Sequence, residues 1–435
     1  MFPKTVDITA ITGIDIIGAP TSWQTQNGPF NVEHLAAVDA NNDVYVFWWS
    51  PAHNWQAVNV TAKTGQKIVG RLTNWQTRSF FVEHLAGRTP LGDLIVFWWS
   101  PAHDWQAVNV SAKTGKRVSA SATSWVTPDG EGGTVEHLAA RGLARELLVF
   151  YWTPSRDWQV VDVTQKTGKT VVEEVTSWLS SDGPLLVEHL AGAAPDGSLE
   201  IFWWSPVHDW QAVNASAIAG GMVSGKSESW ITGIVEHVAI RGRDNRLLVY
   251  WWTSMSNWRM VDVTAITGIY VADVCAVYQI ADSGENVEVL SARSMDGSLL
   301  QFWWKPSRDW QVFNLSHATG SLWASDSTAW ITPSGSRLIE HVAAATPNGH
   351  ILLAWDDGEL RRLTDGCGGP FQLMKRQSGR RQLVAILWDP QRPTDIAPPA
   401  VDVDNLIFGN NNSVRDYFLE NSGGNFTIER AATLG

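Results

Sequence analysis

Apolar and polar positions recur along the chain in one fixed order, and each stretch is typical of a β-strand. Val46–Val60 reads VFWWSPAHNWQAVNV, and Val96–Val110 reads VFWWSPAHDWQAVNV. The apolar run before the Pro-His turn has the length and composition of a strand buried on both faces. The stretch after the turn alternates apolar and polar positions and is rich in β-branched residues, which also indicates a strand. No part of this pattern carries the 3.6-residue apolar period of an amphipathic helix.

The whole pattern repeats seven times. One marker is the second aromatic of the FWW triplet, which recurs at Trp49, Trp99, Trp152, Trp204, Trp252, Trp304 and Trp355. A second marker, VEHLA, has the same period, and its sixth copy carries Val289 in place of histidine. Each unit contains four strand-like stretches, around VEHLA, LLVFWW, DWQAVNVT and TSW. Four strands in each repeat of about 40–50 residues are typical of a β-propeller.

We therefore predict an all-β protein with a seven-bladed β-propeller over residues 1–366. The last unit lacks a TSW stretch, and the N-terminal segment GIDIIGAPTSW, which ends at Trp23, is expected to supply it as an outer strand. Closing the ring with this N-terminal strand removes the open edge of the last sheet. VDIT (6–9) and ELRRLT (359–364) both resemble the third stretch of a unit, so eight candidates exist for seven places.

Composition excludes several classes of partner. The 435 residues carry a net charge of -12 and only 17% charged residues, which argues against a nucleic-acid partner. No apolar run reaches the length of about 18 residues that a membrane span needs. Cys275 and Cys367 exclude a disulfide framework and a cysteine-rich zinc site, and they are compatible with a single bridge. The exceptional residue is tryptophan, with 26 copies.

One tryptophan of each unit directly follows the Pro-His turn. Exposed indoles beside Asp and His or Arg can bind a sugar, because its apolar face stacks on indole and its hydroxyls bind the polar groups. Alternatively, the Asp-Trp pair only shapes the hairpin, and the sequence leaves both readings open. Exposed indoles would favour a ligand and buried ones a scaffold. The candidate ligand-binding residues are His53, Asn54, Trp55, His103, Asp104, Trp105, Arg156, Asp157, Trp158, His208, Asp209, Trp210, Arg308, Asp309 and Trp310.

Glutamate and histidine are neighbours in every VEHLA copy. Side chains of neighbouring strand residues point to opposite faces, so the Glu of one blade is expected to meet the His of the next. Near-identical copies favour architecture over catalysis or a metal ring, and we hypothesise that acid below about pH 6 destabilises the ring. The expected inter-blade ties are Glu33, His34, Glu83, His84, Glu136, His137, Glu188, His189, Glu236, His237, Glu340 and His341.

The repeat stops after Gly366. Residues 367–380 are a basic, glycine-containing linker, and 381–435 have a strand, helix, strand order. In that tail, LVAILWDP and SVRDYFLENSGGNFTI resemble the opening of the catalytic domain of immune inhibitor A-type secreted metallopeptidases. The family binds zinc through an H-E-x-x-H helix whose Glu activates water. No histidine follows His350 and none has that spacing, so we expect no catalytic residues and no cofactor here, and zinc only in a longer product.

The repeats themselves resemble the tryptophan-rich seven-bladed propeller lectins of bacteria. Together the two resemblances imply a module that binds a glycan or another cell-surface ligand and targets a secreted metallopeptidase. The alternative is a protein-interaction scaffold that packs on or regulates the peptidase domain, and the third reading is an enzyme that uses the channel or the tail. We expect an extracellular protein. The start MFPKTVDITAITG has no apolar signal region, so a secretory signal would have to lie upstream.

Overall fold

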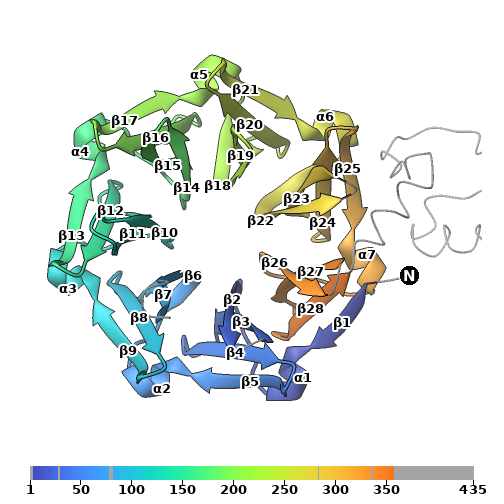
Figure 1. The fold of residues 1–435 in the computed structure, drawn as a ribbon. Helices are drawn as coiled ribbons and strands as arrows, with labels where there is room; N and C mark the ends of the chain where they lie inside the picture. The colour runs from blue at the N-terminus through green and yellow to red at the C-terminus, as the bar shows by residue number, and fades with distance from the viewer. Residues whose placement is uncertain (1–2, 28–29, 78–81, 283, 335–336, 357–435) are drawn as a thin grey trace, which may run out of the picture. The chain divides into compact units, whose positions relative to one another are not determined.

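Seven four-stranded antiparallel sheets are arranged in a ring in the computed structural model of the chain, which confirms the predicted seven-bladed propeller (Figure 1). The structure describes residues 3–27, 30–77, 82–282, 284–334 and 337–356. The chain divides into two units, 1–371 and 372–435. The linker expected at 367–380 and the tail expected at 381–435 lie outside the described residues.

In blades 1 to 6 the four strands follow one another in chain order from the inside of the ring outward, and blade 7 takes its outermost strand from the N-terminus. The innermost strands are β2 (Thr21–Asn27), β6 (Val69–Thr77), β10 (Thr123–Pro128), β14 (Thr176–Asp182), β18 (Val223–Thr232), β22 (Val271–Asp282) and β26 (Thr328–Ser334). The second strands are β3 (Phe30–Val38), β7 (Val82–Arg88), β11 (Thr134–Arg141), β15 (Leu185–Ala193), β19 (Val235–Gly242), β23 (Glu285–Ser294) and β27 (Arg337–Ala345). We number the blades 1 to 7 in this order.

The third and fourth strands form the outer half of each blade. The third strands are β4 (Val44–Ser50), β8 (Leu94–Ser100), β12 (Leu147–Thr153), β16 (Leu199–Ser205), β20 (Leu247–Thr253), β24 (Leu299–Lys305) and β28 (Ile351–Asp356). The fourth strands of blades 1 to 6 are β5 (His53–Asn59), β9 (His103–Asn109), β13 (Arg156–Asp162), β17 (His208–Asn214), β21 (Ser256–Asp262) and β25 (Arg308–Asn314). The fourth strand of blade 7 is β1 (Lys4–Asp7), next to β28.

The N-terminus closes the ring, but with a different segment from the one expected. Thr5 pairs with Ala354 in the antiparallel register of β1 and β28, so the VDIT copy takes the outer place of blade 7. The TSW stretch that ends at Trp23 lies in β2, the innermost strand of blade 1, and our prediction of an outer strand there was wrong. ELRRLT (359–364) lies outside the described residues.

Short helices, which the apolar pattern did not predict, leave the outer strands. They are α1 (Ile8–Thr12), α2 (Val60–Thr64), α3 (Val110–Thr114), α4 (Val163–Thr167), α5 (Ala215–Ala219), α6 (Val263–Thr267) and α7 (Leu315–Thr319). The Asn59 side chain caps α2 by accepting from Ala62 N at 2.7 Å. Gly65 ends that helix with a φ of 74°, a left-handed conformation that glycine adopts at little cost. Asn or Asp caps the other six helices in the same way.

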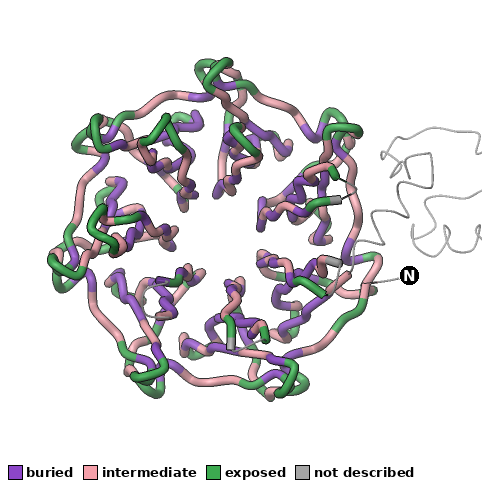
Figure 2. The backbone as a smooth tube through the Cα atoms, in the orientation of Figure 1, coloured by how far each residue is buried: buried purple, intermediate pink, exposed green. Residues whose placement is uncertain are grey.

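The core lies in the wedges between consecutive blades, and the turns and helices at the corners are exposed (Figure 2). Between blades 1 and 2, for example, Val46 and Trp23 of blade 1 pack with Phe97 and Trp105 of blade 2. Successive residues of a strand point to opposite faces, so each strand contributes side chains to two wedges. This accounts for the nearly continuous apolar runs of the third strands.

Candidate functional site

The tryptophan that follows each Pro-His turn is buried. The exposed fractions are 4% for Trp55, 5% for Trp105, Trp158 and Trp210, and 6% for Trp258 and Trp310. These indoles fill the inter-blade wedges, as Trp105 does beside Trp23. Of the two readings that the sequence left open, the burial of these indoles favours the one in which the Asp-Trp pair shapes the hairpin. The two residues before the tryptophan are exposed in each candidate triplet, apart from the half-buried Arg308.

The acidic residue of the turn has structural partners on both carboxylate oxygens. In Asp104, Oδ1 accepts from Trp105 N at 2.8 Å and Oδ2 accepts from Lys63 Nζ of α2 at 2.5 Å. The lysine hydrogen bond is the main reason that the pKa of Asp104 lies below its usual value. The same arrangement joins Lys113 to Asp157 at 2.5 Å and Lys166 to Asp209 at 2.7 Å. This aspartate therefore shapes the hairpin and ties it to the preceding helix.

A different tryptophan is half-exposed beside the turn. It is the first indole of the FWW triplet, and Trp48 lies edge-on to His53 with ring centroids 5.4 Å apart. The pairs Trp98 with His103 and Trp203 with His208 repeat this contact at 5.5 Å and 5.4 Å. The exposed Gln56 stands opposite Trp48 in the register of β4 and β5. Each such edge offers an indole, an imidazole and an amide to solvent.

The sequence placed this first indole in the core. The apolar run LLVFWW looks buried on both faces along its whole length, so nothing in it separates its last residues from the others. A signal was nevertheless present. Trp48 lies two residues before the end of its strand, close to the turn, and the residue that directly follows Trp55 on the other side of the turn, Gln56, is polar.

Glutamate and tryptophan meet across most inter-blade interfaces. In five interfaces the TSW indole donates Nε1–H to the glutamate of the next blade, at 2.8 to 3.2 Å: Trp23 to Glu83, Trp75 to Glu136, Trp125 to Glu188, Trp178 to Glu236 and Trp330 to Glu33. In blade 6, Tyr278 replaces the tryptophan, and its hydroxyl donates to Glu340 at 2.6 Å. Glu288 accepts from the Thr232 hydroxyl of blade 5.

The VEHLA histidine stacks on the same indole and lies near the same glutamate. The rings of Trp23 and His34 are 5.0 Å apart and 9° from parallel. Histidine and glutamate atoms approach to 3.5–3.7 Å in six interfaces: His34 with Glu83, His84 with Glu136, His137 with Glu188, His189 with Glu236, His237 with Glu288, and His341 with Glu33. The residues proposed as inter-blade ties are thus brought together, with the indole as the direct hydrogen-bond partner.

Burial keeps this group close to neutral. It raises the pKa of Glu33, Glu83, Glu136 and Glu188 to about 7, against a partly compensating effect of the indole hydrogen bond. Burial also lowers the pKa of His34, His137 and His189 to about 3, and that of His84, His237 and His341 to about 4. The histidines are therefore neutral at physiological pH, and the contact is not the charged pair that the sequence suggested.

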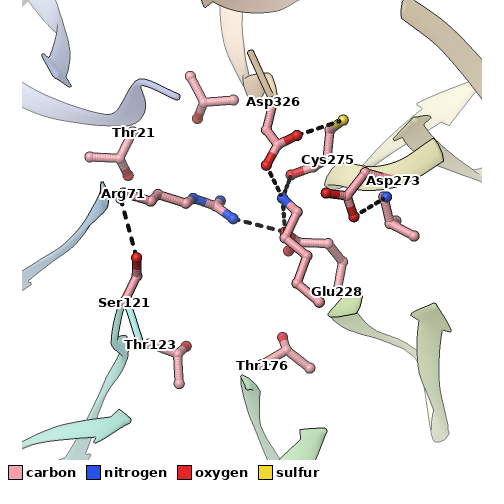
Figure 3. Close-up of polar contacts among 12 residues, drawn as sticks. Thr21, Arg71, Ser121, Thr123, Thr176, Glu228, Asp273, Cys275 and Asp326 are labelled. Atoms are coloured by element: carbon pink, nitrogen blue, oxygen red, sulfur yellow. Dashed lines mark hydrogen bonds and ion pairs between the residues drawn. The ribbon is translucent and has the colours of Figure 1, made fainter. Parts of the chain in front are cut away.

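An asymmetric group of charges lies among the innermost strands, where the sequence analysis identified no site (Figure 3). Arg71 of β6 extends from blade 2 to Glu228 of blade 5, with Nη1 and Oε1 3.1 Å apart. The buried Lys226 lies 2.9 Å from Asp326, and Arg293 lies 3.4 Å from Asp326. One signal was available in the sequence. Blade 5 reads ESW from Glu228, whereas blades 1 to 4 read TSW or TNW and have threonine at that position.

The charged group differs from the contacts between the other innermost strands, which are pairs of hydroxyl groups. Hydroxyl pairs at 2.6–2.7 Å join Ser22 to Thr328, Thr73 to Ser124, Thr123 to Ser177, and Thr176 to Ser229.

Cys275 is a buried free thiol beside the charged group, 3.7 Å from Asp326, and burial raises its pKa to about 12. A thiol with so high a pKa is a poor nucleophile.

The described residues contain neither a metal-binding cluster nor a helix that could span a membrane. Among the residues that the structure describes, no three His, Cys, Asp or Glu side chains are grouped as a metal site requires. Within the same ranges, no helix is long and apolar enough to cross a membrane.

Comparisons with known proteins identify the fold. No family model matches the sequence, and no curated protein matches it either. The structure is similar to that of a lectin from Burkholderia pseudomallei, with a TM-score of 0.58, 15% identity, and coverage of 79% of this chain and 96% of that one. A mutant of the Aleuria aurantia lectin in complex with alpha-methyl-L-fucoside matches with a TM-score of 0.42 and 12% identity, over 69% of this chain and 96% of that one. Only the first likeness is close enough to support the fold.

Proposed function

We propose that the chain is a non-catalytic module that binds extracellular glycans at several related sites on the blade edges. The observation that carries this proposal is the half-exposed indole beside an exposed histidine and glutamine, repeated around Trp48, Trp98 and Trp203. An indole face suits the apolar face of a sugar ring, while imidazole and amide groups suit its hydroxyls. The fold shared with a bacterial lectin supports the same reading.

The sites are related but unequal. In blade 3, Tyr151 and Arg156 replace the indole and imidazole, and in blade 5 Arg259 lies over Trp251 at 5.4 Å. Different cations at otherwise similar edges would give the blades different preferences among neutral and acidic sugars. Several weak sites on one ring bind a multivalent surface much more strongly than any single site does.

The proposal extends to an attached peptidase. The resemblance of residues 381–430 to the opening of an immune inhibitor A-type peptidase domain supports a role in targeting such an enzyme, and that segment lies outside the described residues. Zinc would belong to that enzyme's H-E-x-x-H site and not to the propeller. An extracellular location follows from the same proposal.

A glycan array followed by calorimetry tests the proposal directly. We expect the full chain to bind at least one glycan class, Trp98→Ala to weaken binding, and the triple variant Trp48→Ala, Trp98→Ala, Trp203→Ala to bind far less. Gln106→Ala is a milder second variant, because its side chain is exposed and contacts only its own turn. Leu91→Ala, on an exposed turn between the second and third strands, is the control. No glycan binding by the full chain, or equal binding by the triple variant, would sink the proposal.

One observation favours the second candidate function, a protein-interaction scaffold. The helices share one face with the turns between second and third strands, since Ile68 N after α2 donates to Asn42 O at 2.9 Å. Exposed apolar side chains gather on the segments of this face, including Leu91 (74%), Leu322 (65%), Leu143 (60%), Ile17 (60%), Met295 (58%) and Met222 (51%). The burial of the tryptophans that follow the turns also favours a scaffold. Binding of an immune inhibitor A-type peptidase domain, abolished by Leu91→Asp with Leu143→Asp, would support the scaffold.

A further inference from the structure

The outer edge of blade 5 carries an arginine beside its first indole. Arg259 of β21 stands opposite the half-exposed Trp251 in the register of β20 and β21, and its guanidinium carbon lies 5.4 Å from the centroid of that indole ring. The same position is glutamine in blades 1, 2, 3, 4 and 6, as at Gln56. Arg259 is exposed, and no carboxylate among the described residues forms an ion pair with it. It therefore presents a positive charge to solvent.

The carboxylate that blades 2, 3, 4 and 6 carry at the turn is missing from blade 5. Asn257 takes the place of Asp104, and its Oδ1 accepts from Trp258 N at 2.9 Å, so the hairpin keeps its shape without an anion. The lysine that pairs with that carboxylate is also missing, because α5, which packs on β21, carries Ile218 where α2 carries Lys63. The turn of blade 5 therefore carries no negative charge that would repel an anionic ligand.

The turn histidine is replaced as well. Ser256 takes the register position that His53 has in blade 1. Its hydroxyl lies 2.9 Å from that of Thr253, so the turn stays closed. In blades 1, 2 and 4 the imidazole at this position lies edge-on to the first indole, and serine leaves that edge without a ring. The turn keeps a hydroxyl and the Asn257 amide, which can hydrogen-bond a sugar.

Other cations at blade edges have different surroundings. Arg156 of blade 3 and Arg308 of blade 6 directly precede Asp157 and Asp309 in the turn. A neighbouring carboxylate attracts the cation and repels an anionic ligand. Lys4 of blade 7 stands opposite the first indole, but β1 comes from the N-terminus, so no β28–β1 turn lies beside it. Blade 5 therefore combines the cation with a turn that has no carboxylate.

The position over the indole prepares the guanidinium for an anion. A guanidinium is planar and carries its N–H donors along its edge, so packing over a ring keeps those donors available. They match the two oxygens of a carboxylate, and such charge-assisted hydrogen bonds are stronger than those between neutral groups. Because the indole already restrains the long side chain, less conformational freedom is lost when a ligand binds.

We infer that the edge of blade 5 binds the anionic group of an acidic sugar. Arg259 holds the anionic group, while the Ser256 hydroxyl and the Asn257 amide bind hydroxyl groups of the same sugar. The ligand class rests on the proposed function, whereas the choice of blade 5 rests on the replacements at this edge. Together they add a cation, remove a carboxylate with its lysine, and remove an imidazole.

A pair of probes that differ only in one group tests the inference. Methyl glucuronide has a carboxylate where methyl glucoside has a hydroxymethyl group, and binding of each to the full chain would be measured by calorimetry and saturation-transfer NMR. We expect the glucuronide to bind at least about tenfold more tightly, and Arg259→Gln, which restores the residue of five other blades, to remove that difference. A sulfated methyl glucoside in the same series separates a carboxylate from a sulfate ester as the preferred anion.

Two further variants sharpen the test. Arg243→Gln is the matched control, because it removes the same charge from an exposed position at the other end of β20. Blade 1 shares the neutral corner of blade 5, with Asn54 at the turn, but carries His53 and Gln56. His53→Ser combined with Gln56→Arg should therefore create a second glucuronide-binding event. Its absence would overturn the assignment of the site to these replacements.

The outcomes separate this inference from the proposed function. Equal affinity for both probes, or a glucuronide preference that Arg259→Gln leaves unchanged, overturns the inference and leaves the neutral blade-edge sites standing. A preference that Arg259→Gln removes and the triple variant of Trp48, Trp98 and Trp203 keeps supports it. N-acetylglutamate that binds as tightly as the glucuronide overturns the sugar ligand, because the site would then bind any carboxylate. Failure of the full chain to bind any glycan or either probe overturns both proposals.

Discussion

The indole of Trp23 donates a hydrogen bond to Glu83 across the interface between blades 1 and 2, at a distance of 2.8 Å. The contact joins residues of two sheets that share no backbone hydrogen bonds, and it recurs around the ring. Its glutamate belongs to VEHLA and its tryptophan to TSW, two stretches that recur in most of the repeats. Side-chain contacts of this kind therefore join neighbouring blades, while strand pairing holds each blade together.

Removing the acceptor of this contact is expected to destabilise the ring. Glu83→Leu should lower the free energy of unfolding by about 1–3 kcal/mol, because a buried indole N–H loses its partner. Glu83→Gln keeps an acceptor oxygen and should cost under about 1 kcal/mol, since a near-neutral carboxyl and an amide are alike here. Urea titration at pH 6 measures both. Equal losses in the two variants would mean that the charge of Glu83 matters.

Stability should be greatest over a plateau of pH with losses on both sides. The buried glutamates have a pKa of about 7 in the folded protein, against 4.5 for a free side chain. The protein therefore loses stability as the pH rises from 4.5 through 7 and these groups ionise. The buried histidines have a pKa of about 3 to 4 in the folded protein, against 6.5 for a free side chain. The protein therefore loses stability as the pH falls below 6.5, because the unfolded chain binds these protons first.

The two effects oppose each other between pH 4.5 and 6.5. Melting temperatures should therefore be nearly flat in that window, fall below it because of the histidines, and fall above it because of the glutamates. Scanning calorimetry from pH 3 to 8 measures this curve. A steady decline that already begins at pH 6 on acidification would instead support charged Glu–His pairs, as the sequence alone suggested.

The lysine–aspartate contacts at the blade corners should contribute little as charges. Lys63→Met is expected to change stability by about 0–1 kcal/mol, since both side chains are largely exposed. Asp104→Ala should cost more, because the backbone N–H of Trp105 also loses its acceptor. Asp104→Asn, the residue that blade 1 carries as Asn54, is the matched control. A larger effect for Lys63→Met than for Asp104→Ala would contradict this order.

Arg71, which reaches from blade 2 to blade 5, should be needed only while Glu228 is present. Arg71→Met removes the nearer of two cations beside Glu228 and leaves Lys226 at 3.6 Å, so we expect a loss of roughly 1–3 kcal/mol, less than for a buried pair that loses its only partner. Adding Glu228→Thr, which restores the hydroxyl found at Thr176, should recover most of that loss. A double-mutant cycle of thermal unfolding measures the coupling. Additive losses in the double variant would show that the two residues act independently.

The repeat made the number of blades predictable, but its period carries no information on where a blade begins. TSW was assigned to the end of a unit because VEHLA was taken as its start, and this choice misplaced Trp23. The helices were missed for a different reason. A five-residue helix such as Val60–Thr64 is too short to show an apolar period, and its caps Asn59 and Gly65 determine it.

The candidate site was predicted only in part. The turn motif drew attention to the correct blade edge, yet a sequence does not indicate which of two nearby indoles faces water. Trp55 is buried because it packs against the neighbouring blade, and Trp48 is half-exposed beside it. The contact of Arg71 with Glu228 joins residues far apart in the chain, so no local pattern could predict it.

The pairing of β1 with β28 also bears on how the chain folds. Lys4 is synthesised before blades 1 to 6, and its partner Trp355 follows only after those six blades have been made. Contacts of such sequence separation are slow to form and appear late. Until then, the first strand has an unsatisfied edge, which is a template for pairing with another chain. Ring closure should thus be the slow, concentration-sensitive step of folding, and the stage at which molecules exchange their N-terminal strands.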